Sequence, residues 1–159
     1  VLPSITYWLM GSMASTTRTT LLMGAPFIIA GSLLLFLLRW KLNTMSLPED
    51  EAKSLGIPVK RIRSLVILGA AMVTAAVVSM CGQIGWVGLL IPHMVRMIFG
   101  NDNRSVVPAS MASGALFMLI IDTAARSVMA TEIPVSILTS LIGAPCFILL
   151  LRKTGGIRL

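Results

Sequence analysis

The sequence predicts an all-helical, polytopic membrane protein with about five transmembrane helices and one short helix outside the lipid. Hydrophobic residues make up 56% of the chain and charged residues only 12%, whereas soluble domains carry about 25% charged residues. The mean hydropathy is correspondingly high, at +0.91. The apolar residues form runs of spanning length. The basic residues that give a net charge of +7 flank these runs, which indicates contact with a membrane surface and not with nucleic acid.

We expect residues 1–159 to form one transmembrane unit of several helices. Because the chain starts at Val1 and not at Met, we expect this unit to be part of a longer protein. Residues 1–20 are mixed in polarity and predict the end of a preceding helix followed by a loop. The first clear span is the run of 18 uncharged residues from 21 to 38. Residues 39–41 combine two basic side chains with a tryptophan, which would anchor the end of the span at the interface.

The only long polar stretch, residues 43–63, predicts a cytoplasmic loop that contains a short helix over residues 46–55. Ser46 and Glu49 have the spacing of a capping box, and acidic residues fill the first turn, where the helix dipole favours them. Gly56 then ends the helix. A capped helix between two spans either fills a loop or acts on a partner protein, and the residues alone leave both interpretations open.

The longest uncharged run extends from Leu65 to Val95 and is 31 residues long, roughly 46 Å as a straight helix at about 1.5 Å per residue. A hydrocarbon core is only about 30 Å thick, so the run must break. Glycines at i, i+3 and i+6 and a later proline mark the break: Gly82, Gly85, Gly88 and Pro92. The break is either a half-helix site of the kind found in transporters or a packing kink against a neighbouring helix.

A turn at residues 100–104 separates this run from two further spans, at about 107–127 and 134–151. If the 43–63 loop is cytoplasmic, 11 of the 13 basic residues lie on the cytoplasmic side, and only Arg18 and Arg126 lie outside. The positive-inside rule therefore predicts this orientation, with the C-terminus in the cytoplasm.

Two pairs of polar residues have alternative interpretations. His93 and Arg96, at i and i+3, either form an interfacial pair or belong to a proton relay. Asp122 and Arg126, at i and i+4, either form a simple ion pair or place the arginine for contact with a partner. No spacing of His, Cys, Asp and Glu suits a metal site, and the sequence has no phosphate-binding loop or nucleophile elbow. We therefore expect no cofactor and no metal in this chain.

The stretch from Gly82 to His93, followed by Arg96, resembles the signature of the FecCD family. These proteins are the permease subunits of ABC importers for iron siderophores, haem and vitamin B12. Further stretches resemble the family in the same order along the chain: Leu42-Asn43 with 51–56, Asn103-Arg104 with 107–108, 122–126, Glu132 to Val135, and 143–147. Ser136, Trp86 and Pro48 depart from the family's usual residues. Because family permeases have ten helices, the chain resembles only the C-terminal half.

The resemblance implies a transport subunit without enzymatic activity in a bacterial or archaeal cytoplasmic membrane. Two permease copies would form the pathway through the lipid bilayer, separate ATPase subunits would carry ATP and Mg, and a periplasmic or lipid-anchored binding protein would deliver the substrate. By position, it implies ATPase coupling for Ser46, Glu49, Glu51, Ala52, Leu55 and Gly56, binding-protein docking for Arg126, and structural or pathway roles for Gly82, Gly85, Gly88, Pro92, His93, Arg96, Gly143 and Pro145.

A secondary transporter or channel driven by an ion gradient is the main alternative, but such proteins use buried acids in mid-span, and the sequence has none there. A membrane enzyme that uses His93 with Asp122 fits the predicted topology poorly, because the two residues would lie near opposite faces of the membrane. Within the family, an iron chelate is the favoured substrate, while cobalamin, haem and oxyanions such as molybdate stay open.

Overall fold

The protein is described from a computed structural model, which covers residues 2–14, 16–128 and 134–153. Glu132, which the family resemblance includes, lies outside the described residues. The described residues form seven α-helices and one short 3-10 helix and contain no strand. In chain order, these elements are α1 (Leu2–Leu9), α2 (Arg18–Leu42), η1 (Asn43–Ser46), α3 (Glu49–Ser54), α4 (Val59–Cys81), α5 (Val87–Phe99), α6 (Asn103–Val128) and α7 (Val135–Lys153).

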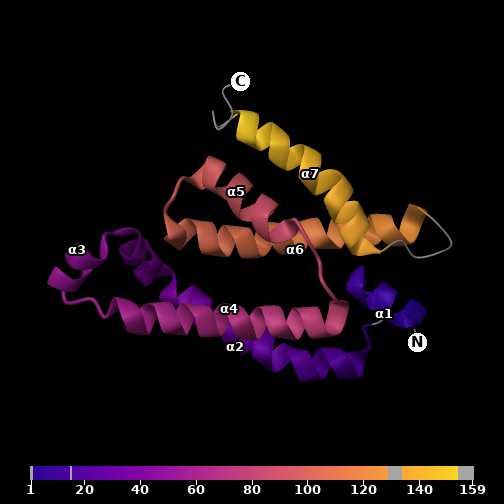
Figure 1. Ribbon diagram of the computed structural model, residues 1–159, viewed down its shortest axis with the longest axis horizontal. Helices are drawn as coiled ribbons and strands as arrows, with labels where there is room; N and C mark the ends of the chain where they lie inside the picture. Colours follow the sequence, from indigo (N-terminus) through magenta and orange to yellow (C-terminus); the bar gives the residue numbers. More distant parts are fainter. Residues whose placement is uncertain (1, 15, 129–133, 154–159) are drawn as a thin grey trace.

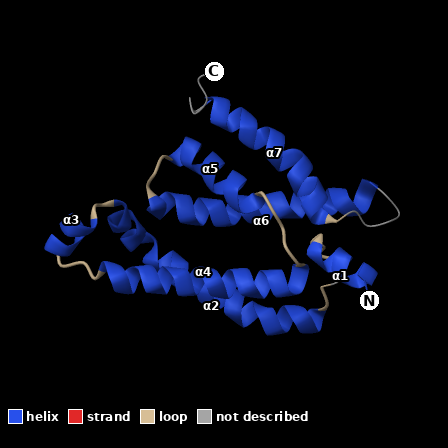
Figure 2. Cartoon of the chain, in the orientation of Figure 1, coloured by secondary structure: helices blue, strands red, loops and turns tan. Residues whose placement is uncertain are grey.

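The long helices form two groups. In Figures 1 and 2, α2 and α4 run side by side, and α5, α6 and α7 lie together on the other side of the molecule. The short helix α3 projects at one end, the same end at which α5 turns into α6 (Figure 1). At the opposite end, α1 lies beside the turn from α4 into α5 (Figure 1).

The fold class is confirmed as an all-helical membrane architecture. Among the described residues, α2, α4, α6 and α7 are long and apolar enough to cross a membrane. The remaining segment, α5, has only 13 residues and is about 20 Å long at about 1.5 Å per residue. Of the five predicted segments, four are therefore of full length and one is a short apolar helix.

Three helices begin earlier than the hydropathy predicts, among them α2, which starts at Arg18 and not at residue 21. The helix α4 starts at Val59, within the stretch expected to be loop, directly after Pro58. The helix α6 starts at Asn103, within the predicted turn. Hydropathy marks only the part of a helix that lies in lipid, so first turns that carry Lys60 or Arg104 give no apolar signal although they are helical.

Small residues bring α2 and α4 into close contact. A Cβ added to Gly31 would lie 2.7 Å from the carbonyl oxygen of Gly69, and a Cβ added to Gly69 would lie 3.2 Å from Cγ of Leu35. A Cβ on Gly24 would collide with the sulfur of Met80. In lipid the hydrophobic effect contributes little to helix association. The close approach of α2 and α4 stabilises their association through van der Waals packing.

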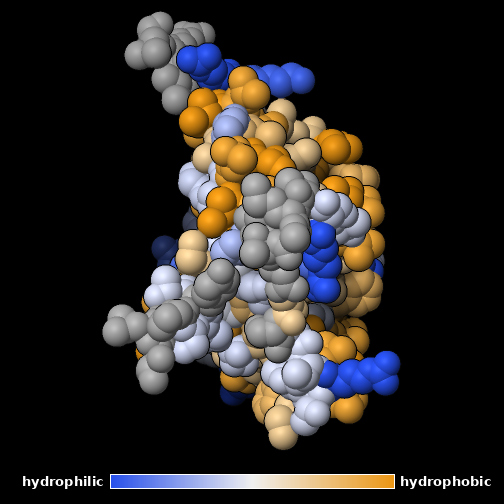
Figure 3. Space-filling view, turned by 90° about the vertical axis from the view of Figure 1, so that its right-hand side faces the viewer, coloured by the Kyte–Doolittle hydropathy of each residue, from blue (hydrophilic) through white to orange (hydrophobic). Residues whose placement is uncertain are grey.

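The spanning helices bury little of their apolar surface against each other. Only 11% to 22% of the most apolar window of each helix is buried within the fold. Large side chains such as Leu22, Ile98 and Leu141 are exposed. Figure 3, which views the end near α1, shows hydrophobic side chains along the sides and paler, more polar ones across that end. Such surfaces require an apolar environment, either lipid or further helices.

Three segments that are far apart in the sequence meet through their backbones at the α1 end, in what we call the glycine junction (residues 8–12, 81–83 and 135–136). The N–H of Ser12 donates to the carbonyl oxygen of Cys81 at 2.9 Å, and the N–H of Val135 donates to that of Gly11 at 3.0 Å. The hydroxyl of Ser136 donates to the carbonyl oxygen of Met10. The junction therefore joins the loop after α1 to the end of α4 and the start of α7.

Gly82 at the junction has no room for a side chain. Its φ of +71° with ψ of −167° belongs to a region that is essentially restricted to glycine, and an added Cβ would collide with the carbonyl oxygen of Trp8. Gly11 is similarly confined, because its added Cβ would lie 2.5 Å from the carbonyl oxygen of Gln83. The end of α4 is therefore specified by a contact that admits only glycine.

We expect Gly82→Ala to destabilise the fold by at least about 3 kcal/mol, through backbone strain and collision with Trp8. The matched control is Gly88→Ala, since a Cβ on Gly88 meets no atom within 4 Å. Because Gly88 lies in the first turn of α5, Gly88→Ala should change the free energy of unfolding by no more than about 1 kcal/mol. Thermal unfolding in detergent measures both variants, and equal midpoints would contradict this assignment.

Candidate functional site

The loop helix α3 begins later than the sequence predicts. Its N-cap residue is Pro48, which makes no side-chain cap hydrogen bond, and Ser46 is instead the last residue of η1. The predicted capping box is therefore wrong. The physical reason is Pro48 itself, because the residue before a proline is held extended, and Leu47 has φ −78° and ψ 151°. A helix cannot run from Ser46 through such a residue.

A Schellman motif ends α3. The N–H of Ile57 donates to the carbonyl oxygen of Ala52 at 3.1 Å, and the N–H of Gly56 donates to that of Lys53 at 2.9 Å. Gly56 has a φ of +72°, and an added Cβ there would meet no atom within 4 Å. Glycine is therefore needed at this position for its backbone conformation and not for space.

One side of α3 is packed and the other is open. Ala52 is only 1% exposed, whereas Leu55 is 67% exposed, although it is a large apolar side chain. Ser46, Glu51 and Gly56 are also exposed, and the backbone of Glu49 starts the helix. The residues predicted to couple to an ATPase thus lie together on one short loop, with Leu55 largely exposed.

The break between α4 and α5 contains a strained residue. Trp86, the N-cap residue of α5, has a φ of +67°, and no other described residue except glycine has a positive φ. Such a conformation costs on the order of 1–3 kcal/mol and persists only where the surroundings enforce it. Gly143 of α7 leaves the room that Trp86 needs, because a Cβ there would lie 2.8 Å from Cβ of Trp86.

The glycines and prolines of the break play different parts. Cβ atoms on Gly85 and Gly88 would meet no described atom within 4 Å, so only Gly82 of the three makes the close contact that a packing kink requires. Pro92 lies inside α5 and Pro145 inside α7, and each removes one helical N–H. Both helices are therefore locally weakened where they pass near one another.

His93 and Arg96 contact different elements. The ring of His93 lies edge-on to Phe147 of α7, with centroids 5.9 Å apart, and its buried Nε2 has no hydrogen-bond partner within the described fold. Phe147 also packs edge-on to Trp86, at 6.3 Å. Arg96 is exposed and lines a hollow of about 460 Å³ with residues of η1 and of the α5–α6 turn. The interpretation of the two residues as an interfacial pair stays a prediction.

Two polar residues that line this hollow, Asn43 and Asp102, had no role predicted from the sequence. The side-chain amide of Asn43 donates from Nδ2 to Oδ1 of Asp102 at 2.6 Å, and its Oδ1 accepts from the N–H of Asn103 at 2.9 Å. Asp102 Oδ1 also accepts from the N–H of Arg104 at 3.1 Å and so caps α6. We call Asn43, Asp102 and Asn103 the polar clasp, because they join the start of the α3 loop to the α5–α6 turn.

At the other end of the molecule, Arg126 forms an ion pair within α6. Its Nε lies 2.9 Å from Oδ2 of Asp122, and 53% of the arginine side chain is exposed. The ion-pair interpretation is confirmed, and the pairing leaves much of the guanidinium surface open to solvent. Asp122 and His93 thus have separate partners, which gives no support to a joint catalytic role.

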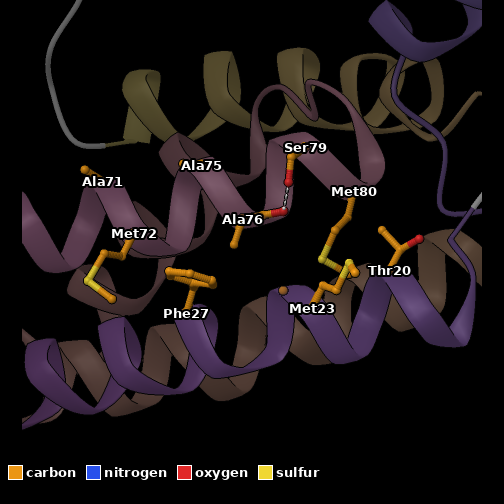
Figure 4. Close-up of a pocket in the computed structure, with 10 residues that line it drawn as sticks. Thr20, Met23, Phe27, Ala71, Met72, Ala75, Ala76, Ser79 and Met80 are labelled. Atoms are coloured by element: carbon orange, nitrogen blue, oxygen red, sulfur yellow. Dashed lines mark hydrogen bonds between the residues drawn. The ribbon is translucent and has the colours of Figure 1, made fainter.

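An apolar groove of about 610 Å³ lies between α2 and α4. Figure 4 shows Met23 and Phe27 of α2 facing Ala76 and Met80 of α4 across it. The hydroxyl of Ser79 in this groove is already bonded to the carbonyl oxygen of Ala76, at 2.8 Å (Figure 4). The groove therefore offers an apolar surface to lipid or helices and few groups to a polar solute.

The described residues contain no group of three or more His, Cys, Asp and Glu side chains that could hold a metal ion. Cys81 and Cys146 are free thiols, the first buried and the second partly buried.

The profile of the FecCD transport family matches residues 1–153. The chain belongs to the FecCD transport family. It is 48% identical over 153 residues to the molybdate import system permease MolB of Haemophilus influenzae, covering 96% of this chain and 45% of MolB. It is 38% identical over 154 residues to a probable iron chelatin transport system permease of Helicobacter pylori, covering 97% of this chain and 47% of that protein.

The fold also matches a solved structure. A structure assigned to the metal-chelate type of ABC transporter, in an inward-facing conformation, superposes with a TM-score of 0.92 at 47% identity. The match covers 96% of this chain and 49% of that chain. This member of the FecCD transport family is thus a multi-pass membrane protein that spans about half the length of the relatives it matches.

We expect Gly56→Ala to loosen the end of α3, because alanine at φ +72° is strained by about 1 kcal/mol or more. Trypsin cleavage after Lys53, in membranes with the loop accessible, should become several-fold faster. The matched control is Gly56→Asn, since asparagine tolerates the left-handed conformation and should cleave nearly as slowly as glycine. Equal rates for alanine and the parent chain would show that the Schellman motif does not hold the loop.

Proposed function

We propose that the chain forms part of the permease subunit of an ATP-binding-cassette importer. It would contribute helices to the translocation pathway for an iron siderophore or a related metal chelate. It would perform no covalent chemistry, and separate ATPase subunits with bound ATP and Mg would supply the energy. Membership of the FecCD transport family supports this proposal, because the matched relatives carry the names of import permeases.

The observation that carries the proposal is the open face of α3. A capped helix of six residues lies between two spanning helices, with Leu55 largely exposed and Ala52 buried. An exposed leucine at the end of a rigid helix is suited to enter an apolar recess on a partner subunit, where its burial would contribute about 1.5–3 kcal/mol. We assign that partner as the ATPase subunit.

The remaining partners follow from the surfaces and the charge distribution. A second permease copy, further helices and lipid would cover the apolar faces that the fold leaves open. A periplasmic or lipid-anchored binding protein would dock at the α6 end that carries Arg126. The excess of basic residues on the α3 side supports placement in a bacterial or archaeal cytoplasmic membrane with the C-terminus in the cytoplasm.

An iron or other metal chelate is the substrate class that we propose. Names among the relatives extend from iron chelatin and molybdate to cobalamin and hemin, which shows how varied the cargo of the family is. No observation favours the alternative of a carrier driven by an ion gradient. Asp122 is the one acidic residue in the described spanning helices, and it is paired with Arg126.

We expect Leu55→Ser to weaken association of the permease with its ATPase subunit by about tenfold, because it removes the exposed apolar contact. The matched control is Leu149→Ser, since Leu149 on α7 is 64% exposed against 67% for Leu55 but lies on a spanning helix. Pull-down of the ATPase from membranes, with insertion measured in parallel, distinguishes the two variants. Unchanged association for Leu55→Ser, or normal transport after deletion of the loop, would reject the assigned coupling role.

We also expect Arg126→Gln to slow association of the substrate-binding protein by about tenfold at low salt, because a charge at the docking surface is lost. Asp122→Asn is the matched control: it breaks the same ion pair but keeps the arginine charge. Association rates at two salt concentrations test this. If both variants slow association equally, the ion pair and not the free charge is what matters, and the docking role of Arg126 is wrong.

A further inference from the structure

Coupling through α3 requires a route from the loop into the membrane, and the polar clasp provides one. We propose that Asn43 is a positioning residue for transport, which carries movement of the α3 loop to the α5–α6 turn and thereby to α5. This inference rests on the proposed coupling role of α3. It adds a specific residue and a specific helix to that role.

The clasp joins two distant segments by both ends of a single amide. Asn43 donates to Asp102, which lies 59 residues away, and accepts from Asn103, which lies 60 residues away. A planar amide that is held at both its nitrogen and its oxygen cannot rotate without losing one bond. The turn therefore keeps a fixed distance and orientation relative to η1.

The charge of Asp102 strengthens the clasp. The bond from the Asn43 amide, followed by that from the backbone N–H of Arg104, holds the pKa of the Asp102 carboxyl below its usual value. The carboxyl is therefore ionised at neutral pH, and its contribution to the clasp is lost only as the pH falls through this lowered pKa. The guanidinium of Arg104 also lies 4.1 Å from the ring centroid of Trp40 on α2, a second contact between the same helix ends.

Little flexible chain separates α3 from α5 along this route. Two residues, Leu47 and Pro48, connect η1 to α3, and the ring of Pro48 restricts one of them. On the other side, α5 ends at Phe99, and three residues lead to α6. A displacement of α3 is therefore passed through η1 and the clasp to the last turn of α5.

The far end of α5 is where such a displacement would have an effect. That end begins at Trp86, whose strained backbone is held against Gly143 of α7. The 13 residues of α5 connect the two ends, so a shift at Phe99 is carried along the helix, past Pro92, to the contact at Trp86. Asn43 thus links the cytoplasmic loop to the α5–α7 contact.

A reversal of the two partners tests the clasp. Asn43→Asp places two carboxylates against each other and removes the amide donor, so the bond to Asp102 is lost. In Asp102→Asn, the amide of Asn43 can still donate to the side-chain oxygen at position 102. This variant should therefore have a smaller effect than Asn43→Asp. In the double variant the amide stands at position 102 and the carboxylate at position 43, so the side-chain bond can form again in the opposite direction, and the oxygen at position 43 can still accept from the N–H of Asn103.

The measurement uses the permease assembled with its ATPase subunits, with Cys81 and Cys146 replaced by serine. Spin labels at the exposed positions Leu89 of α5 and Leu141 of α7 report the change in their separation on addition of ATP. We expect Asn43→Asp to reduce the fraction of molecules that respond by about tenfold and the double variant to restore it. ATPase association should stay unchanged in all three variants, which a general folding defect would not produce.

Thr44→Val is the matched control, since the Thr44 hydroxyl bonds only locally, to the carbonyl oxygen of Lys41 at 2.6 Å. It should leave the response to ATP intact. An intact response in Asn43→Asp, or a double variant no better than Asn43→Asp, would overturn the inference. If Leu55→Ser abolishes the response and Asn43→Asp does not, the role of Asn43 is wrong while the proposed function stands. If Leu55→Ser leaves ATPase association unchanged, the proposed function itself fails.

Discussion

Backbone contact at the glycine junction is the constraint on which the rest of this fold depends. Ser12 donates to the carbonyl oxygen of Cys81, and Val135 donates to that of Gly11, so one loop fixes both the end of α4 and the start of α7. No side chain fits at Gly82, so the helix must end there. With α4 ended and α7 anchored, α5 packs against α6 and α7, and Trp86, which has a positive φ, lies directly against Gly143 of α7.

The sequence was sufficient for the spans, the break and the loop that carries a short helix, because each has a strong local signal in hydropathy, glycine spacing or charge. It was less informative about where helices begin. Val59 and Asn103 start helices among charged residues, where lipid no longer imposes an apolar pattern. The capping box failed for a local reason, since Pro48 excludes its preceding residue from a helix and thereby overrides the favourable spacing of Ser46 and Glu49.

The contacts within the candidate sites depend on tertiary structure and could not be predicted from spacing. His93 and Arg96 share a helix face by their spacing, yet Phe147 of α7 approaches only the first of them. Asn43 and Asp102 are 59 residues apart and belong to no common periodic pattern. Two stretches that resembled the family separately, Leu42-Asn43 and Asn103-Arg104, turn out to be halves of one contact. The only sequence signal for this contact was therefore that both stretches resemble the family. No spacing or periodic pattern predicts that they meet.

The short length of α5 affects the membrane around it. At about 20 Å it leaves roughly a third of the hydrocarbon thickness unspanned, and the non-helical residues 82–86 lie in the remaining depth. Peptide groups outside a helix cannot face acyl chains, so water or protein must surround them. The depth beside α5 is thus filled by a thinned bilayer, by water or by further protein. Where water fills it, the apolar layer beside α5 is thinner than beside any of the four longer helices.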